Sequence, residues 1–220
     1  MTRKRTQIYQ KFRESDFVLG NNNGYDVPLS AIGQRLQKKR TSGLALCDLS
    51  AMSRAGFKSA AVDPWCEAKC GIAAPSINQG ALTDNGLLIA RLSGTEILMM
   101  EDLAAKGDFE LMLQGVPAAY LIPRQDSHHC FMLLGQHCAS LFSKLCAVDL
   151  RGHKFQRMQV AQTVMARVGV IVVRRDIEQT PAFYLLTDSS LAEYLWDCLL
   201  DAMQEFEGEV IGINDLPAGG

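Results

Sequence analysis

The clearest periodicity in the chain lies near its C-terminal end, where apolar side chains recur every three or four residues. This spacing places them on one face of a helix, over Leu191, Tyr194, Leu195, Cys198, Leu199, Ala202, Met203 and Phe206. Ser190 followed by Glu193 fits a capping box, and Gly208 follows the end. The apolar face can pack on a sheet of the same chain, which is its commoner use, or fill a groove on a partner.

Elsewhere the apolar residues form short runs typical of strands. They lie at 44–49, 55–57, 87–92, 97–100, 118–122, 130–134, 160–173 and 182–186. The runs on either side of Ser93-Gly94 predict a hairpin. Short helices are expected from Asp63-Pro64 to Gly71, at 109–113 and at 136–145. The pattern predicts an α+β protein rich in strands.

A faint repeat, displaced by 76 positions, groups these elements. Residues 55–72 have the outline of a strand followed by a helix, and residues 131–148 have the same outline. At the same displacement, residues 89–92 correspond to 165–168. We therefore expect tandem strand-helix-strand units with mostly antiparallel sheets and packed helices, although two unrelated α+β units would look similar.

The expected organisation has three parts. Residues 1–42 form an extended leader with basic clusters at 3–5 and 35–40, which either stays solvated or docks on an acidic partner. Residues 43–208 form the folded domain, with pseudo-repeats at about 43–115 and 116–208. Residues 209–220 form a tail without an evident role.

Composition narrows the class of protein without naming an activity. The chain has 220 residues, of which 48% are hydrophobic, and a net charge of −2 with a pI of about 6.1. The hydrophobic fraction is ample for a packed core. The net charge gives no sign of binding to nucleic acid or to a membrane surface. There is no apolar run long enough to span a membrane and no secretory signal at the N-terminus. We expect a cytoplasmic protein.

The seven cysteines do not form a disulfide or zinc pattern. Their number is odd and their surroundings are apolar, so we expect buried thiols in a reducing compartment. Cys66 and Cys70 lie four residues apart, and His and Cys residues crowd positions 128–138, so metal binding is an alternative. Since there is no C-x-x-C pair or H-E-x-x-H motif, we predict no metal site.

Known catalytic motifs are missing from the sequence. It contains no nucleophile elbow, P-loop, dinucleotide glycine fingerprint or kinase signature. The most polar stretch is Pro123-Arg124-Gln125-Asp126-Ser127-His128-His129, whose side chains could meet an anion or move a proton. A β-turn has the same composition and is the preferred interpretation. We therefore assign no catalytic, cofactor-binding or metal-binding residue.

Several motifs resemble one known family. Residues 43–50 (GLALCDLS) with 54–57 (RAGF) resemble the opening signature of the folate-binding aminomethyltransferase superfamily, which includes the glycine cleavage T protein. Four later segments are similar to the gamma-subunit family of heterotetrameric sarcosine oxidases and to the related small subunit of N-methylglutamate dehydrogenase: 123–128, 146–155, 160–168 and 192–196. The resemblance covers roughly residues 43 to 206 and depends on the ordered set of segments.

The resemblance implies a non-catalytic accessory chain in a cytoplasmic heterotetramer. Its partners would be larger alpha and beta flavoenzyme subunits and a small delta subunit, which act in sarcosine catabolism and one-carbon metabolism. The complex would oxidatively demethylate a secondary N-methyl amine and transfer the one-carbon unit to tetrahydrofolate. Tetrahydrofolate, FAD, FMN and NAD would belong to the partner subunits, and this chain would bind no cofactor.

One departure from the family pattern favours this accessory role. Active aminomethyltransferases carry an Asp pair after a glycine-rich turn, whereas the matching segment here, residues 85–91, has Ile89 and Ala90 at those positions. An aliphatic side chain cannot accept a proton, and the nearest acid, Asp84, precedes the turn.

Two alternatives remain: a stand-alone tetrahydrofolate-dependent aminomethyltransferase or demethylase, and a folate-sensing module. Either would need a pocket within this chain. Methionines could line it, although we expect them to fill the core: Met99, Met100, Met112 and Met132.

Overall fold

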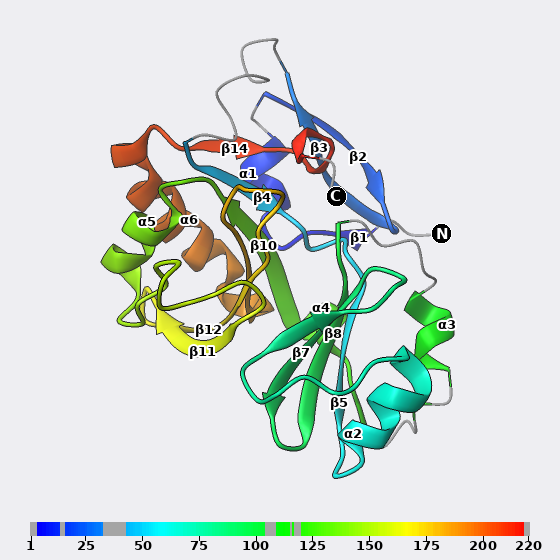
Figure 1. Cartoon of the computed structure of the whole chain (residues 1–220). Helices are drawn as coiled ribbons and strands as arrows, with labels where there is room; N and C mark the ends of the chain where they lie inside the picture. Colours follow the sequence, from blue (N-terminus) through cyan, green and yellow to red (C-terminus); the bar gives the residue numbers. More distant parts are fainter. Residues whose placement is uncertain are drawn as a thin grey trace.

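The protein, represented by a computed structural model, is described over residues 4–13, 16–32, 43–103, 109–114, 116 and 120–217. These ranges form three β-sheets, of six, five and three strands. The two larger sheets lie next to each other, with short helices on their outer sides, and the three-stranded sheet lies above them in Figure 1. The chain is therefore an α+β protein with mostly antiparallel sheets, as predicted.

The six-stranded sheet has the order β11-β12-β13-β10-β4-β14. Neighbouring strands are antiparallel, except that β14 runs parallel to β4. The strands are β4 (Ala45–Asp48), β10 (His128–Leu134), β11 (Val160–Met165), β12 (Val168–Arg174), β13 (Ala182–Asp188) and β14 (Glu209–Ile211). The strands expected from the apolar runs in these regions are confirmed, and the longest run folds as the β11–β12 hairpin.

The five-stranded sheet has the order β6-β7-β8-β5-β9 and is antiparallel throughout. Its strands are β5 (Arg54–Lys58), β6 (Gly80–Leu82), β7 (Leu87–Ser93), β8 (Glu96–Glu101) and β9 (Leu121–Ile122). One face is covered by α2 (Val62–Trp65), the π-helix η2 (Cys66–Cys70) and α3 (Phe109–Leu113). The predicted hairpin and the predicted helix at 109–113 are confirmed.

Both larger sheets follow the same path. In each, a strand and a helical segment are followed by three strands, so that β5, β6, β7 and β8 correspond to β10, β11, β12 and β13. The strand that precedes each set in the sequence joins the other sheet. Strand β4, which precedes β5, pairs with β10, and β9, which precedes β10, pairs with β5. A duplication of the chain stays a prediction.

The 76-residue displacement describes only part of this correspondence. It superposes β5 and the α2–η2 helical segment on β10 and α5 (Cys138–Leu145). The second pair of blocks does not match, because 89–92 lies inside β7 whereas 165–168 contains the β11–β12 turn. Ala166 and Arg167 have left-handed φ angles of 47° and 71° there. Later loops differ in length, so one fixed displacement does not hold along the chain.

A shared core joins the two larger sheets. Leu88 and Met100 of the five-stranded sheet pack with Met132 and Leu186 of the six-stranded sheet, and all four are fully buried. At roughly 25 cal/mol for each Å² of apolar surface removed from water, such a core stabilises the arrangement of the two sheets. They therefore form one packed unit.

The outer face of the six-stranded sheet is covered by α5 and α6 (Ala192–Met203). Leu195, Trp196 and Leu199 of α6 are buried against this sheet, which confirms that the apolar face packs within the chain. The expected capping box of Ser190 and Glu193 does not form. Asp188 accepts the hydrogen bond from the Ser190 amide, and Leu191, the N-cap residue of α6, makes no side-chain hydrogen bond. No helix in the described ranges is long and apolar enough to cross a membrane.

The N-terminal region differs from the expected extended leader. Its described part forms β1 (Lys4–Arg5), α1 (Tyr9–Arg13), β2 (Phe17–Asn22) and β3 (Tyr25–Ala31), with sheet order β1-β3-β2. Ile8 and Phe12 are at most 2% exposed and belong to the core of the six-stranded sheet. These two buried apolar residues, one before α1 and one in it, attach the segment to the core. Their spacing was too weak a signal to predict the packing from the sequence.

The basic residues of this region contact acidic groups of the same chain. Lys11 pairs with Glu193 and Asp197 of α6, at 3.2 and 2.9 Å, and Lys4 pairs with Asp126 at 3.2 Å. Of the two, only Lys4 belongs to a predicted basic cluster, and its side chain is 58% exposed beside Asp126. The basic cluster at 35–40 lies outside the described residues.

The C-terminal segment is also more than a tail. Strand β14 extends the six-stranded sheet, and its Ile211 is 1% exposed. Asp215 then accepts hydrogen bonds from the amides of Ala31 and Gly212, at 2.9 and 3.0 Å. The segment therefore fastens the three-stranded sheet to the six-stranded one.

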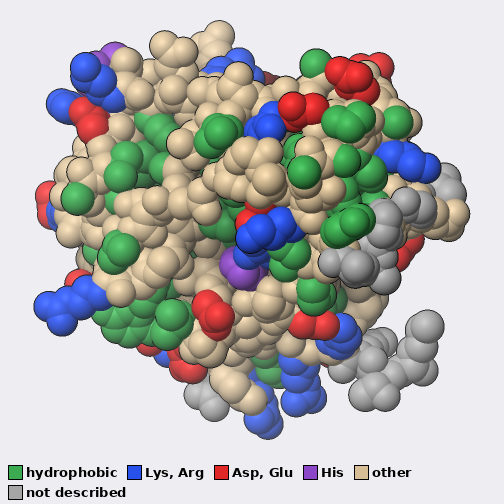
Figure 2. All heavy atoms as spheres, turned by 90° about the horizontal axis from the view of Figure 1, so that it is seen from below, with side chains coloured by type: hydrophobic (Ala, Val, Ile, Leu, Met, Phe, Trp, Pro, Cys, Tyr) green, Lys and Arg blue, Asp and Glu red, His purple; other side chains and the backbone are tan. Residues whose placement is uncertain are grey.

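Exposed apolar side chains are spread over several elements. The most exposed include Val18 on β2, Ile32 after β3, Ile77, Val164 on β11 and Tyr194 on α6, at 47–60%. Seen from below, hydrophobic side chains form separate patches, with Lys, Arg and His side chains near the middle of the face (Figure 2). Apolar exposure is therefore not concentrated in one area of this face.

Candidate functional site

The polar stretch 123–129 folds as a short helix followed by the start of a strand. Helix α4 (Arg124–Ser127) has Pro123 at its N-cap and is followed directly by β10. It replaces the expected β-turn, although the same turn-forming residues begin it. Its side chains do not converge on one point, because they join three separate networks of contacts.

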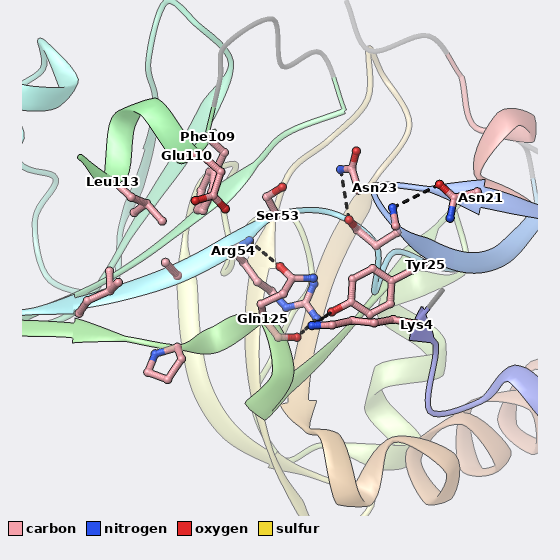
Figure 3. A pocket seen from close by; sticks show the side chains of 15 residues that line it. Lys4, Asn21, Asn23, Tyr25, Ser53, Arg54, Phe109, Glu110, Leu113 and Gln125 are labelled. Carbon is pink, nitrogen blue, oxygen red and sulfur yellow. Dashed lines mark hydrogen bonds between the residues drawn. The ribbon is translucent and has the colours of Figure 1, made fainter. Parts of the chain in front are cut away.

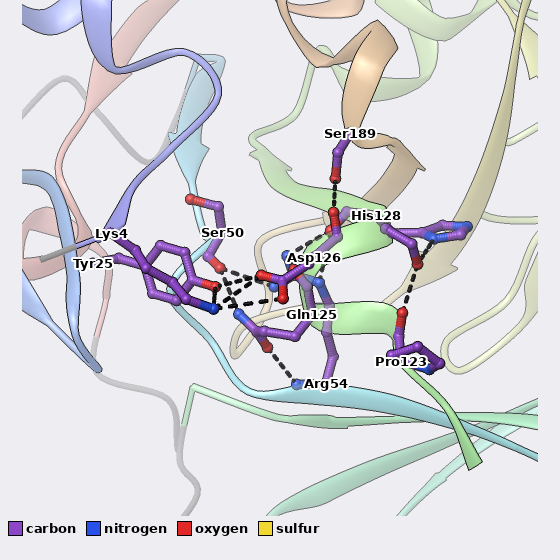
Figure 4. A network of polar contacts seen from close by, with 10 residues as sticks. Lys4, Tyr25, Ser50, Arg54, Pro123, Gln125, Asp126, His128 and Ser189 are labelled. Carbon is purple, nitrogen blue, oxygen red and sulfur yellow. Dashed lines mark hydrogen bonds and ion pairs between the residues drawn. The ribbon is translucent and has the colours of Figure 1, made fainter. Parts of the chain in front are cut away.

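Arg54 holds this helix against the beginning of β5. It is 3% exposed, and its guanidinium donates to the carbonyl oxygens of Ser50, Met52, Gln125 and His128 at 2.5–3.0 Å. Burial lowers the pKa of Arg54. All these acceptors are carbonyl oxygens, so this side chain acts as a clamp between the segment before β5 and the α4 region (Figure 4).

The first network joins α4 to the N-terminal region. Asp126 accepts hydrogen bonds from Lys4 at 3.2 Å and from the Tyr25 hydroxyl at 3.1 Å (Figure 4). These bonds hold the pKa of Asp126 below its ordinary value. Since the group is largely exposed, the pair contributes little stability by itself but fixes where β1 and β3 meet α4.

The second network surrounds His128. Arg124 donates to His128 Nε2 at 2.7 Å and pairs with Glu96 at 2.5 Å, while His128 Nδ1 lies 2.9 Å from the Ser127 hydroxyl. Burial and the positive charge of Arg124 lower the pKa of His128 to about 4. The imidazole is therefore neutral near pH 7 and cannot serve as a proton donor there.

The third network is a buried pair, His129 and Asp48, whose Nε2 and Oδ1 atoms are 3.1 Å apart. Burial by itself would raise the pKa of Asp48, but the neighbouring His129 ring and a hydrogen bond from the Ser50 amide hold it below its ordinary value. The other ring nitrogen of His129 lies 2.8 Å from Gln7 Oε1. Both residues are 0% exposed, so the pair joins β4, β10 and the N-terminal segment.

A cavity of about 770 Å³ opens beside the first network. One wall is mainly apolar and comes from β5, α3 and the region before α4: Ala55, Phe109, Leu113, Leu121 and Pro123. The opposite wall is polar and comes from the N-terminal region: Lys4, Asn21, Asn23 and Tyr25 (Figure 3). Ser53, Arg54 and Gln125 form the base between the two walls.

This lining can hold a molecule with an apolar part and a polar part. The volume lies within the range of small-molecule sites in proteins. Among the described lining residues, no Ser, Thr or Cys has a His or carboxylate partner suited to activate it as a nucleophile. The geometry therefore supports binding better than catalysis.

Ile89 and Ala90, the residues that the sequence resemblance compares with the acids of active aminomethyltransferases, lie in β7. Ile89 and Ala90 are both 0% exposed. Ile89 packs under α2 and α3, and Ala90 points into the core shared by the two sheets. Asp84 is exposed in the turn before β7. Neither Ile89 nor Ala90 lines the cavity.

The methionines considered as a pocket lining are core residues. Met99, Met100 and Met132 are 0% exposed, and Met112 of α3 packs half-buried against the core of the five-stranded sheet. None of them lines the cavity. The interpretation of these residues as core filler is confirmed.

All seven cysteines lie in the described ranges and are free thiols. Cys47, Cys66, Cys130 and Cys138 are buried, as expected, whereas Cys70, Cys146 and Cys198 are partly exposed. In the part of the chain that the structure describes, no three His, Cys, Asp or Glu side chains are placed to hold a metal ion.

Solved structures identify the fold. A chain of heterotetrameric sarcosine oxidase from Corynebacterium sp. U-96 is similar with a TM-score of 0.67 and 19% identity, over 92% of this chain and 96% of that chain. The glycine cleavage system aminomethyltransferase T from Bartonella henselae is similar with a TM-score of 0.74 and 16% identity, over 96% of this chain and 60% of that chain.

The protein therefore shares its fold with this sarcosine oxidase chain and with aminomethyltransferase T, as the sequence motifs predicted. At these identities the similarity establishes the fold and not the activity. The chain spans less than two thirds of the aminomethyltransferase T chain. No family model matches the sequence, and a search of curated proteins finds no significant match.

Proposed function

We propose that this chain is the non-catalytic gamma-type subunit of a cytoplasmic, sarcosine-oxidase-like heterotetramer. The complex would oxidise a secondary N-methyl amine and pass the one-carbon unit to tetrahydrofolate. Larger alpha and beta subunits and a small delta subunit would supply FAD, FMN, NAD and the folate site. This chain would complete the assembly without binding a cofactor.

One observation carries this proposal: the match takes in nearly all of a chain of a heterotetrameric sarcosine oxidase. The similarity covers 92% of this chain and 96% of that one. By contrast, 40% of the aminomethyltransferase T chain lies outside the match. The extent of the first match supports a subunit of a heterotetramer.

The chemistry of β7 supports the same choice. Ile89 and Ala90 offer no group that accepts a proton or attracts a cationic intermediate. Both side chains are buried in the core, so they also do not face a ligand in the cavity. Catalysis would then depend on the partner subunits.

Copurification tests the proposal. The tagged chain, expressed in its native cells, should be recovered with larger chains in fixed stoichiometry, and the eluate should show flavin absorbance. Mass spectrometry of the intact complex would give the subunit ratio. Recovery of the chain alone, at 24.2 kDa and without flavin, would contradict the accessory role.

The cavity favours a second candidate, a folate-binding module that acts by itself. Its apolar wall could hold a pterin or benzoyl ring, and its polar wall could hold a carboxylate or amide group. Calorimetry with tetrahydrofolate tests this: saturable binding by the isolated chain, weakened at least about tenfold by Leu113→Gln but not by Leu82→Gln, would favour the module. Leu113 lines the cavity, whereas Leu82 lies on β6 away from it.

A further inference from the structure

The loop between α5 and β11, residues 146–159, carries a group of exposed basic side chains. Arg151, Lys154 and Arg157 are all exposed, and so is the neighbouring His153. Asp149 is the only acid of the loop, and its carboxylate accepts hydrogen bonds from the Arg151 guanidinium at 2.8 and 2.6 Å. The loop therefore has an excess of positive charge, in a chain whose net charge is −2.

Two of these cations have no acidic partner within the described residues, Lys154 and Arg157. Arg157 donates to the carbonyl oxygen of Asp176 at 3.4 Å, but the carboxylate of Asp176 pairs with Arg174 at 2.8 Å. Exposed charges attract an opposite charge over a Debye length, which is about 10 Å at 0.1 M salt. Lys154 and Arg157 are thus available to attract an acidic surface.

The loop is fixed to the core beneath it. Leu150 and Phe155 are 3% and 6% exposed and belong to the core of the six-stranded sheet. The Phe155 ring stacks on Phe183 with centroids 6.4 Å apart, and its carbonyl oxygen accepts a hydrogen bond from Arg174 at 2.5 Å. Its amide donates to the carbonyl oxygen of Arg151 at 2.8 Å. A loop that is already ordered loses little conformational entropy when it binds a partner.

An open hollow of about 570 Å³ lies beside the basic group, between α5 and the first part of the loop. Small side chains and one larger apolar side chain line most of it: Ala139, Ser140, Ser143, Ala147 and Val148. Val148 is 37% exposed. Arg151 also lines the hollow, so the hollow and the basic group form one continuous surface, here called the α5–β11 surface. It lies beside α5 at the left of Figure 1.

We propose that the α5–β11 surface docks an acidic segment of a larger partner subunit. The inference rests on the proposed function, in which this chain joins larger subunits. Carboxylates of the segment would pair with Lys154 and Arg157 at the rim, and an apolar side chain would enter the hollow and contact Val148. A nucleic acid would use the cations alone, whereas an apolar hollow with a charged rim is typical of protein interfaces.

Charge reversal tests this surface in the intact complex. A tagged chain with Lys154→Glu and Arg157→Glu would replace the native chain in its cells. The control is Arg13→Glu with Lys69→Glu, which reverses two exposed cations on α1 and η2. Because charges of like sign across an interface repel, we expect the first variant to lower recovery of the larger chains at least about tenfold and the control to leave it unchanged. All four positions are exposed, so both variants should melt at the temperature of the parent.

Failure of the docking surface can be distinguished from failure of the proposed function. If the parent and the Lys154→Glu, Arg157→Glu chain recover the larger chains equally, the surface is wrong and the accessory role stands. If the parent recovers no larger chain, the accessory role fails, and this inference fails with it. Equal loss from both double variants would show a general effect of charge. Release of the larger chains by nuclease would show a nucleic-acid bridge. Either of these results would also overturn the proposal.

Carbodiimide coupling gives a second readout, since it joins an amine to a carboxylate that contacts it. We expect Lys154 to be coupled to an Asp or Glu of a larger chain in the complex, as mass spectrometry of tryptic peptides would show, and Lys69 to remain uncoupled. Val148→Asp should also reduce recovery, because it places a like charge before the acidic segment, whereas Val18→Asp, at a side chain 50% exposed on β2, should not. A complex that leaves Lys154 uncoupled and is recovered in full with Val148→Asp would contradict the docking surface.

Discussion

Arg54 shows how a single buried side chain fastens two loops that are far apart in the sequence. Its donors serve four backbone carbonyl oxygens, in the segment before β5, in α4 and at the start of β10. A lysine has three donors on one atom and cannot reach all four acceptors. We expect Arg54→Lys to lower the free energy of unfolding by about 1–3 kcal/mol, the cost of one unsatisfied buried polar group.

Urea denaturation of both proteins checks this expectation. Arg151→Lys is the matched control, because the Arg151 side chain is 64% exposed and pairs with its close neighbour Asp149. Its free energy of unfolding should stay within about 0.5 kcal/mol of the parent. Equal stability of Arg54→Lys and Arg151→Lys would show that the clamp contributes nothing.

His128 makes stability depend on pH. Its pKa falls from 6.5 to about 4 in the folded protein. Between these values the unfolded chain binds a proton at this residue that the folded chain does not. The contribution of His128 to the free energy of unfolding is therefore complete above pH 6.5 and is lost as the pH falls toward 4. We expect His128→Gln to flatten this decrease in denaturation curves measured from pH 7 to 4.

The control for His128 is His153→Gln, since His153 is exposed in a loop. It should retain the steep decrease of the parent. A His128→Gln protein that loses stability over this pH range as steeply as the parent would contradict the account of its protonation.

The sequence indicated which residues in this region are polar but not what they bind. The composition of 123–129 permitted a turn or a reactive site. The partners that decide between them, Lys4, Arg54 and Glu96, lie up to 122 residues away in the sequence. Long-range pairing of this kind leaves no local signal, so the three networks could not be predicted.

Among the elements, the N-terminal helix α1 differs most from its prediction. Phe12 is 2% exposed and contacts Trp196 of α6 with ring centroids 5.3 Å apart. If α1 is part of the core, Phe12→Ala should lower the free energy of unfolding by about 3–5 kcal/mol. If residues 1–42 were a solvated leader, the same substitution would leave the free energy of unfolding almost unchanged.

Thermal and urea denaturation would measure this loss. Val18→Ala is the control within the same region, because Val18 is 50% exposed on β2. It should cost less than about 1 kcal/mol. A cost for Phe12→Ala no larger than that for Val18→Ala would mean that α1 does not belong to the core.

Local periodicity predicted most strands and helices of the folded domain, including the β7–β8 hairpin and α3, because their signals lie within short windows of sequence. It could not predict which strands pair. The exchange of β4 and β9 between the two sheets depends on contacts between distant segments, and β14 joins a sheet from a segment with only three strand residues. The π-helical form of Cys66–Cys70 also has no signal in apolar spacing.

For the whole molecule, the cavity and the core lead to different conclusions about function. The cavity between the N-terminal region and α3 has the size and the mixed lining of a binding site. Ile89 and Ala90, for which the sequence resemblance predicts acids in active aminomethyltransferases, are buried in β7. A fold can be kept while its chemistry is lost, and an accessory subunit accommodates both observations.

The most direct test of this account is turnover by the purified chain alone. The isolated protein would be supplied with FAD, tetrahydrofolate and sarcosine, and both formaldehyde and methylene-tetrahydrofolate would be measured beside the copurified complex. The account predicts product from the complex and none above the blank from the isolated chain. Demethylation by the isolated chain, abolished by Asp84→Asn, would contradict it and identify a carboxylate that acts in place of the missing pair.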